Sequence, residues 1–500
     1  MKNKFTKAIT SIIVVMMLVL TAIPFVSAAS LLDESKKVSI SLNCNKPGYT
    51  FEVFKVASLD STSTTPYETK YTALVSGIET AINSGKTADI LKALDGMSTL
   101  PTSAVSQGSW TTSTSSTSKT YANLEQGIYY IKATNYPAGV KAVTNSVVAL
   151  PYFSSNNSWV YSVPAINLAN KVIEDTPVTH KTITNSTKNN ENYTDVSLGD
   201  TVNFEIKSTV GGSSAMKLGS YTVYDDMSKG LTLDKNSFNV ALLNASGTKI
   251  TDLDKSEYTV NVTSEGDGEN TKFNVALTNA YLQTEEFYAS DVVYTSVTYS
   301  AVLNKHAVVG TAGNPNTEEK LEYSNKNGVK SEVEGNTVYV YTYAAMTNKT
   351  DPDGKPLSGE EFKLYATEAN ANAHTSELAT GVSDSEGKVL YYNSNDEEMK
   401  LASGDYYIVE TKAPVGYSPY GKVIKISIDA TYGDTLVNGT YVTNSPENGY
   451  ASVDVPNYPI TTPKTGGIGT SIFYIAGSAL LIGSGIFFFI ARKKKSRNTK

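Results

Sequence analysis

The chain contains 500 residues, carries a formal net charge of −7, and has one cysteine and three histidines. The acidic balance argues against a nucleic-acid-binding protein, and a single cysteine excludes a disulfide within the chain. The scattered histidines argue against a histidine-based metal site or catalytic triad, so we expect no metal and no cofactor. The abundance of Thr, Ser, Tyr and Val favours an all-β fold.

The first 28 residues have the layout of a secretory signal peptide. Early lysines precede an apolar stretch over 12–20, and the small residues at 26–28 suit a cleavage site. The alternative is an N-terminal membrane helix, but the apolar core is short and Pro24 interrupts it. We expect the mature, secreted protein to begin near Ala29.

A first domain is predicted over residues 29–171. Its opening segments, 38–42 and 49–54, alternate apolar and polar residues as strands do. Between residues 71 and 97 the apolar residues recur at spacings of three and four, which predicts a small helical insertion on a β domain. The Ser- and Thr-rich stretch 109–120 is a loop by composition.

Two further β domains are expected over residues 172–335 and 336–459. The second domain starts with a strand at 178–183, and the third starts with the alternating run 338–343. Short alternating strands of this kind are typical of tandem immunoglobulin-like β-sandwiches.

An internal repeat connects the first and third domains. Residues 127–139 align without gaps on residues 404–416, and each copy runs from a Tyr-rich strand into a Pro/Gly turn. The two domains are therefore expected to share a β-sandwich plan. The copies differ at one position, which is Ala133 in the first domain and Glu410 in the third.

The last segment, 460–500, combines a short motif, an apolar run over 472–490 and a basic end. The run is about long enough to cross a ~30 Å hydrocarbon core, and the basic cluster favours a cytoplasmic tail. This arrangement resembles the LPxTG cell-wall sorting signal of Gram-positive bacteria, which a sortase cleaves between Thr and Gly. The matching residues are Thr462, Pro463, Lys464, Thr465 and Gly466, with Thr462 where that signal usually has Leu.

Two motifs of the third domain resemble Gram-positive pilins. Residues 406–417 (YYIVETKAPVGY) are similar to the pilin E-box, and residues 349–359 (KTDPDGKPLSG) are similar to the opening of a CnaB-like domain. In that family a first-strand Lys forms an intramolecular isopeptide bond with a last-strand Asn, assisted by the E-box Glu. The resemblance implies Lys349, Asn457 and Glu410 for these roles.

The chemistry of this bond needs these residue types in a buried place. A Lys amine attacks a carboxamide only when it is neutral, and burial lowers the pKa of Lys while it raises that of a carboxyl. Strand alternation places Asn457 on the same face as Val453 and Val455, which points it into the core. The alternative is a solvated Lys, a turn Asn and an exposed Glu.

The second domain offers a similar set with a different acid. Residues 221–231 resemble the catalytic-Asp segment of the fimbrial D2, or CnaA-like, domain. The resemblance implies Lys181 on the first strand, Asp225 as the acid and Asn325 as the partner. Asp226 and Asn316 are the competing choices.

The first domain is expected to have a different role, because Ala133 stands in the acid position and no isopeptide bond is expected there. In pilin shafts a sortase joins the motif Thr to a Lys at the end of the next subunit's first domain. The Trp159-x-Tyr161 lead-in and the position at the domain junction fit this pattern, although the usual Tyr-Pro-Lys is absent, and we expect Lys171 to accept Thr465. An ordinary linker lysine is the alternative.

The resemblance implies a structural subunit of a covalent, wall-anchored surface pilus that contributes to adhesion, not an enzyme. The implied partners are class C and housekeeping sortases, identical subunits, ancillary pilins, peptidoglycan and host surface ligands, with transient membrane retention through the C-terminal segment. The alternative is a monomeric wall-anchored adhesin or an ancillary pilin. A surface hydrolase would need a catalytic cluster that the sequence does not contain.

Overall fold

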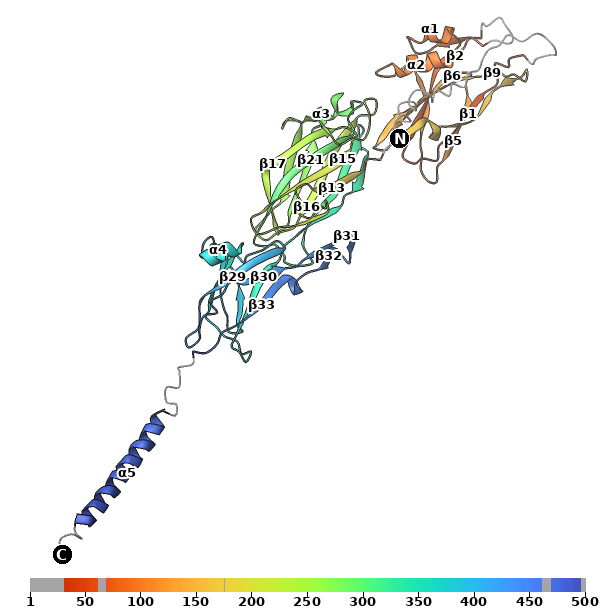
Figure 1. Ribbon diagram of the computed structural model, residues 1–500. Helices are drawn as coiled ribbons and strands as arrows, with labels where there is room; N and C mark the ends of the chain where they lie inside the picture. The colour runs from red at the N-terminus through yellow and green to blue at the C-terminus, as the bar shows by residue number, and fades with distance from the viewer. Residues whose placement is uncertain (1–30, 62–68, 175, 461–468, 496–500) are drawn as a thin grey trace. The chain divides into compact units, whose positions relative to one another are not determined.

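The computed structural model describes residues 31–61, 69–174, 176–460 and 469–495 (Figure 1). The predicted leader, 1–28, and the motif residues Thr462 to Gly466 lie outside the described residues. The chain divides into two compact units. One runs to Thr342 and includes Gly433–Tyr441, and the other contains Tyr343–Tyr432 and the residues from Val442 onward. Both units are built mainly of β-strands, which confirms the all-β prediction.

The first domain contains a sheet of order β3-β2-β6-β8, with β4 also paired to β2, and a second sheet of order β11-β1-β5. Its strands are β1 (Val38–Asn43), β2 (Thr50–Leu59), β3 (Tyr71–Ala73), β4 (Val105–Thr111), β5 (Ser118–Leu124), β6 (Gly127–Asn135), β7 (Val140–Val143), β8 (Ser146–Leu150), β9 (Tyr152–Phe153), β10 (Trp159–Val160), β11 (Ser162–Asn167) and β12 (Val172–Glu174). The 3-10 turn η1 (Ala169–Lys171) joins β11 to β12.

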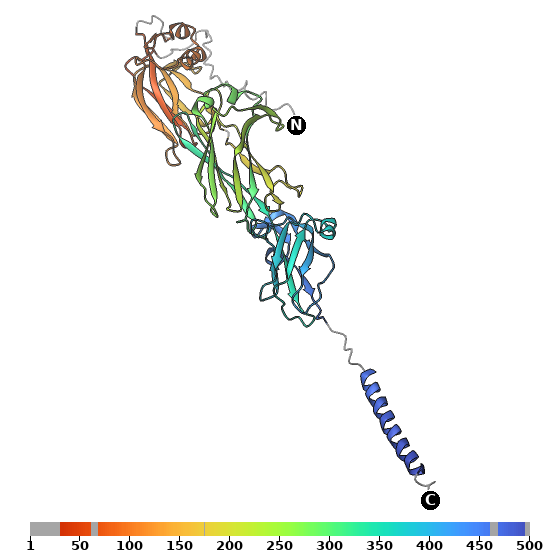
Figure 2. The same ribbon diagram turned by 90° about the vertical axis from the view of Figure 1, so that its left-hand side faces the viewer.

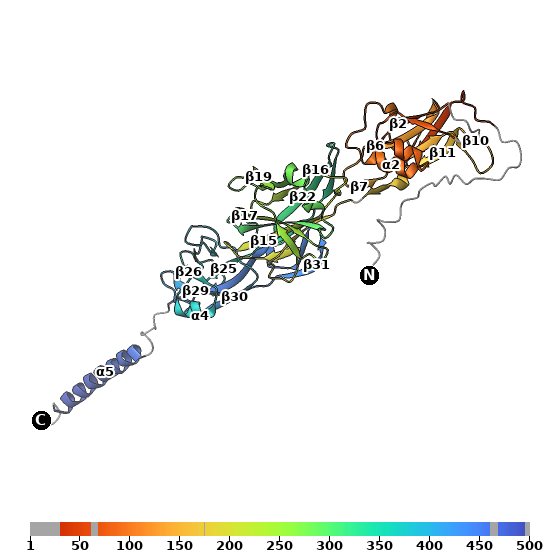
Figure 3. The same cartoon turned by 90° about the horizontal axis from the view of Figure 1, so that it is seen from above.

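The predicted helical insertion forms two short helices, α1 (Glu79–Asn83) and α2 (Thr87–Asp95), which lie side by side (Figure 2). Helix α2 lies beside the sheet that contains β2 and β6 (Figure 3). Ile90 and Leu94, one turn apart, are the residues that α2 buries. The predicted loop 109–120 is shorter than expected, because Trp110 and Tyr121 enter the core and extend the strands on either side.

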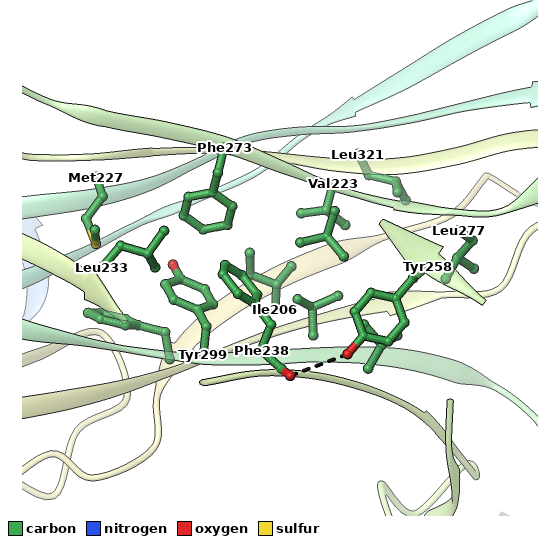
Figure 4. Close-up of a cluster of buried hydrophobic side chains, with 14 of the residues drawn as sticks. Ile206, Val223, Met227, Leu233, Phe238, Tyr258, Phe273, Leu277, Tyr299 and Leu321 are labelled. Atoms are coloured by element: carbon green, nitrogen blue, oxygen red, sulfur yellow. Dashed lines mark hydrogen bonds between the residues drawn. The ribbon is translucent and has the colours of Figure 1, made fainter. Parts of the chain in front are cut away.

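The second domain packs two sheets face to face, of order β13-β15-β21-β17-β18 and β14-β24-β22-β16-β20-β19, with β23 paired to β22. Figure 4 shows Phe273, Val223 and Leu321 of one sheet pointing toward Tyr299, Phe238 and Ile206 of the other. The strands are β13 (Thr179–Ile183), β14 (Tyr193–Asp195), β15 (Thr201–Thr209), β16 (Leu218–Met227), β17 (Leu231–Leu243), β18 (Lys249–Asp252), β19 (Tyr258–Ser264), β20 (Thr271–Leu277), β21 (Tyr294–Leu303), β22 (Asn314–Asn325), β23 (Lys330–Glu334) and β24 (Thr337–Tyr341), with α3 (Asn279–Leu282) and η2 (Glu286–Tyr288) between β20 and β21.

The third domain contains sheets of order β28-β25-β33 and β27-β26-β29-β30. Most of the run 338–343, which was predicted to open this domain, instead forms β24 and pairs with β22 and β14 of the second domain. Its first and last strands, β25 (Ala344–Thr350) and β33 (Tyr450–Pro456), are parallel neighbours, and Lys349 pairs with Val455. The other elements are β26 (Glu361–Tyr365), α4 (Glu368–Ala373), β27 (Ala379–Val382), β28 (Lys388–Leu390), β29 (Gly404–Lys412), β30 (Ile424–Ile428) and η3 (Glu447–Gly449). Between β30 and η3 lies the hairpin of β31 (Thr431–Val437) and β32 (Thr440–Asn444), of which Gly433–Tyr441 belongs to the unit that runs to Thr342.

Helix α5 (Gly469–Lys495) follows the domains. Its segment Ile472–Lys493 has a mean hydropathy of 2.0 and is long and apolar enough to cross a membrane. Within the described ranges it is the one helix that meets this condition.

Candidate crosslinking sites

Lys181 lies in the core of the second domain and contacts both a carboxyl and a carboxamide. Its Nζ donates a hydrogen bond to Asp225 Oδ2 at 2.5 Å and another to Asn316 Oδ1. The three side chains come from β13, β16 and β22, and none is more than 1% exposed. The two sheets therefore bring an amine, an acid and an amide together away from water.

Burial favours the neutral forms of the Lys181 amine and the Asp225 carboxyl. Loss of solvation lowers the pKa of Lys181, against the opposing effect of Asp225. Loss of solvation likewise raises the pKa of Asp225, although Lys181 and the hydroxyl of Tyr299 act the other way. A neutral amine beside a protonated carboxyl is the state in which Lys181 can act as a nucleophile.

Tyr299 completes this cluster and was missed by the sequence analysis. Its hydroxyl donates to Asp225 Oδ2 at 3.1 Å and accepts from Asn316 Nδ2 at 2.9 Å. Its ring, with that of Phe204, lies under the Lys181 amine, 5.5 and 5.6 Å from Nζ. No sequence signal separates this tyrosine from the other tyrosines of the chain, which number 33 in all.

The structure does not bring Asn325 to Lys181. Asn325 ends β22, nine residues beyond Asn316, which is roughly 30 Å along a strand. Its Nδ2 donates to the backbone carbonyl of Tyr136, and its Oδ1 accepts from the amides of Asn327 and Val329. The carboxamide in contact with Lys181 is therefore that of Asn316, the competing choice, and not that of Asn325.

The acid in contact with Lys181 is Asp225, as expected, and not its competitor Asp226. The Asp226 side chain pairs with Lys272 at 2.9 Å and accepts a hydrogen bond from Asn270, on the face of the sheet away from the core. Alternation along β16 buries one carboxyl and leaves its neighbour half-buried.

The third domain buries all three of its predicted residues. Lys349 and Asn457 are 0% and 1% exposed, and Glu410 is 6% exposed. Asn457 Nδ2 donates to Glu410 Oε1 at 2.6 Å, and the Asn457 amide donates to the carbonyl of Thr350 at 2.9 Å. The acid and the amide are therefore in direct contact beside the strand that carries Lys349.

Lys349 is held against the last strand by its amine. Nζ donates to the carbonyl of Val455 at 2.8 Å and to that of Thr350 at 3.2 Å. Burial lowers the pKa of Lys349, and the nearby Glu410 opposes this effect. Asn457 Oδ1 is buried without a hydrogen-bond partner in the described part of the chain, so its carbonyl is open to a new donor.

Lys171 lies in η1 at the end of the first domain, partly buried. Burial lowers its pKa, and its amine has no carboxylate partner among the described residues. The following strand is fixed to the domain because Glu174 accepts from Tyr49 Oη at 2.5 Å and from the amine of Lys46. The junction that carries Lys171 is thus held in place.

The first domain also brings an acid and an asparagine together. Asp95 Oδ1 accepts from Asn145 Nδ2 at 2.9 Å and from Tyr130 Oη at 2.6 Å. Tyr130, and not a lysine, is the third member of this cluster. Ala133, at the position of the third domain's acid, contributes its backbone amide to Asn145.

Family models match three parts of the chain. Residues 198–327 match the Gram-positive pilin backbone subunit 2, Cna-B-like domain, residues 345–441 match the SpaA prealbumin-like fold domain, and residues 463–497 match the LPXTG cell wall anchor motif. The anchor match and the apolar helix α5 indicate a surface protein that is anchored to the cell wall after transient membrane retention.

A curated relative is the trypsin-resistant surface T6 protein of Streptococcus pyogenes serotype M6, which is 27% identical. The alignment covers 55% of this chain and 61% of the relative, so the chain spans about three fifths of that protein's length.

Solved structures share the fold. The T6 backbone pilin of serotype M6 Streptococcus pyogenes has a TM-score of 0.50 and 19% identity, with 86% of this chain and 100% of that chain covered. The RrgB pilus protein of Streptococcus pneumoniae has a TM-score of 0.50 and 14% identity, with 86% and 99% covered. The chain therefore contains a Cna-B-like domain of the Gram-positive pilin backbone type, a SpaA-type prealbumin-like domain and an LPXTG cell wall anchor motif, and it is similar in sequence to the T6 surface protein.

Proposed function

We propose that this chain is the shaft subunit of a covalent surface pilus and that its second and third domains are each closed by an intramolecular isopeptide bond. The observation that carries this proposal is the contact of the buried Lys181 amine with both Asp225 and Asn316. A buried amine and carboxyl contribute little to stability compared with well-packed apolar side chains, so their presence at the centre of a core favours a chemical role.

In the second domain the bond joins Lys181 to Asn316. The neutral amine attacks the carboxamide carbon, the protonated Asp225 polarises the carbonyl, and the amide nitrogen leaves as ammonia. Tyr299 supports this arrangement because it holds both Asp225 and Asn316.

In the third domain the bond joins Lys349 to Asn457, with Glu410 as the acid. Glu410 holds the amide of Asn457, and the paired strands β25 and β33 carry the two reacting side chains. A bond here links the first strand of the domain to the residue directly after its last strand.

Both bonds would brace the domains against unfolding and pulling. Lys181 and Asn316 are 135 residues apart in sequence, and a crosslink that closes a loop of this size stabilises the fold by roughly 4 to 5 kcal/mol in the chain-entropy model. Unlike a disulfide, an amide between side chains is not opened by reduction.

Polymerisation is proposed to join Thr465 of one subunit to Lys171 of the next, catalysed by a class C sortase. A housekeeping sortase then transfers the fibre to peptidoglycan, and ancillary pilins and host ligands contact the finished fibre, which contributes to adhesion. The lowered pKa of Lys171 and its lack of a carboxylate partner within the described residues support its role as the acceptor amine.

The test is the high-mass ladder of cell-wall extracts on a denaturing gel. Lys171→Arg should abolish the ladder, because the guanidinium is not a nucleophile at neutral pH. The matched control is Lys55→Arg, since burial lowers the pKa of this first-domain lysine as well. An undiminished ladder from Lys171→Arg would exclude this acceptor, and a single-subunit band from the native protein would favour a monomeric adhesin or a singly placed ancillary pilin.

A further inference from the structure

The second domain contains another buried carboxyl, Glu318, that the crosslinking scheme does not use. It lies on β22 two residues beyond Asn316, and 1% of its surface is exposed. The hydroxyl of Thr179 donates to Oε1, whereas Oε2 is buried without a hydrogen-bond partner in the described part of the chain. Burial of a carboxyl with an unpaired oxygen lowers the stability of the fold, so such a group calls for an explanation.

Glu318 belongs to the cluster around the reacting amine. Its backbone partner across the sheet is Asp225, so the two carboxyls occupy opposite positions on β16 and β22, both on the core side. Thr179, which binds Glu318, precedes Lys181 by two residues on β13. The titratable groups that interact with Glu318 are Lys181, Asp225, Tyr221 and Tyr299, and Asp226 acts on Lys181 and Asp225 from the other face of β16.

Formation of the amide needs two proton transfers at different atoms. The carbonyl oxygen of Asn316 needs a donor while negative charge develops on it, and the attacking nitrogen has to lose a proton. One carboxyl can do these tasks only in turn. Two carboxyls with different proton affinities can do them together, as in other paired-carboxyl sites.

We propose that Glu318 is the proton acceptor for the crosslink of the second domain and that Asp225 is the donor, an inference that rests on the proposed Lys181–Asn316 bond. The bond between Nζ of Lys181 and Cγ of Asn316 forms, and the bond between Cγ and Nδ2 breaks. Glu318 takes a proton from Nζ and passes it to Nδ2, which leaves as ammonia. Asp225 donates to Oδ1 and recovers its proton when the carbonyl re-forms.

The electrostatics of Glu318 suit this role. Burial raises its pKa to about 7, although Thr179 and Lys181 lower it. A base with a pKa near the working pH gives the best balance between its ionised fraction and its proton affinity. The rate of crosslinking should therefore rise as the pH increases through about 7 and Glu318 ionises.

The third domain repeats the arrangement with different residues. Glu360, just before β26, is fully buried, accepts from the Ser383 hydroxyl through Oε2, and leaves Oε1 without a partner among the described residues. It interacts electrostatically with Lys349, as Glu410 does. Each reacting lysine thus has two buried carboxyls near it. One, Asp225 or Glu410, contacts a reacting side chain, and the other, Glu318 or Glu360, accepts a hydrogen bond from a hydroxyl.

The experiment follows crosslink formation in the chain from residue 29 to 465, made by cell-free synthesis, purified in denaturant and refolded at a series of pH values. Intact mass counts the ammonia lost with time, and tandem mass spectrometry of tryptic peptides identifies the Lys181–Asn316 product. Glu318→Gln should slow the formation of this product by at least about tenfold and remove the rise in its rate of formation near pH 7. The control is Glu319→Gln, because Glu319 pairs with Lys272 on the opposite face of the same strand.

The outcomes separate the two proposals. If the native chain never yields the Lys181–Asn316 peptide, the crosslink itself is excluded. If the native chain yields it and Glu318→Gln forms it at the native rate with the native pH profile, Glu318 is not the acceptor. If Glu318→Gln fails to fold, the native pH profile decides the question, since a rate that does not rise between about pH 6 and 8 overturns the role of Glu318.

Discussion

Lys181 Nζ lies 2.5 Å from Asp225 Oδ2, and neither side chain is exposed to solvent. This contact joins the first strand of the second domain to the opposite sheet through its core. Removal of either side chain should destabilise the fold, because the other is then left buried without its partner.

The first prediction concerns the acid. Asp225→Asn should prevent the crosslink of the second domain, since the amide can neither donate a labile proton to the carbonyl nor accept one. The native chain should lack the mass of two ammonia molecules, and Asp225→Asn should lack one. Asp226→Asn, which alters the half-buried neighbour that pairs with Lys272, should still lack two. Loss of both molecules from Asp225→Asn would remove Asp225 from the reaction.

The second prediction distinguishes the two asparagines of β22. Asn316→Ala should abolish the crosslink and lower the free energy of unfolding by roughly 4 to 5 kcal/mol. Asn325→Ala should keep the crosslink and lower the free energy of unfolding by about 1 to 3 kcal/mol, because it removes the hydrogen-bond acceptor of two backbone amides. Intact mass and chemical denaturation measure the two effects. Retention of the crosslink in Asn316→Ala would return the assignment to Asn325.

The difference between the two asparagines also shows how far the sequence could predict these sites. In the third domain a specific motif and regular alternation predict Lys349, Glu410 and Asn457, and the structure buries all three side chains, while their crosslinking role stays a prediction. In the second domain the register shifts between Tyr224 and Asp225, so Glu319 is an extra residue in β22. An odd spacing of nine would place Asn316 and Asn325 on opposite faces of a regular strand, yet both are buried here. A bulge of this kind has no signature in a single sequence.

A second kind of residue also could not be predicted from the sequence, because its role depends on how the two sheets pack against each other. Tyr299 and Glu318 lie on β21 and β22, and their roles depend on which strands face each other across the core. Thr and Tyr alternation in β21 predicts a strand but does not select one tyrosine. The contact of Thr179 with Glu318 likewise joins residues 139 apart in sequence.

The third prediction concerns pH. Because the pKa of Glu318 in the fold is about 7, above its ordinary 4.5, the neutral carboxyl stabilises the fold fully below pH 4.5, and this contribution is lost as the pH rises through 7. The shift corresponds to about 3 kcal/mol. In an uncrosslinked Asn316→Ala background, the free energy of unfolding should fall from pH 5 to pH 8 more than in the same background with Glu318→Gln. Equal changes in urea denaturation would show that Glu318 does not titrate in this range.

The fourth prediction tests whether the third domain is closed between its first and last strands. The exposed turn at residues 393–397 is held by Asn393, whose Oδ1 accepts from the amides of Asn395 and Glu397, and a protease site inserted after Asn395 should be tolerated there. Once cut and denatured, the native chain should migrate as one species, because the Lys349–Asn457 bond bridges the cut. Glu410→Gln should separate into two fragments, since the neutral amide cannot relay protons to the leaving nitrogen. The control is Glu398→Gln, a nearby carboxyl that pairs with Lys400 and accepts from Tyr450, and it should still migrate as one species. Two fragments from the native chain would exclude the bond.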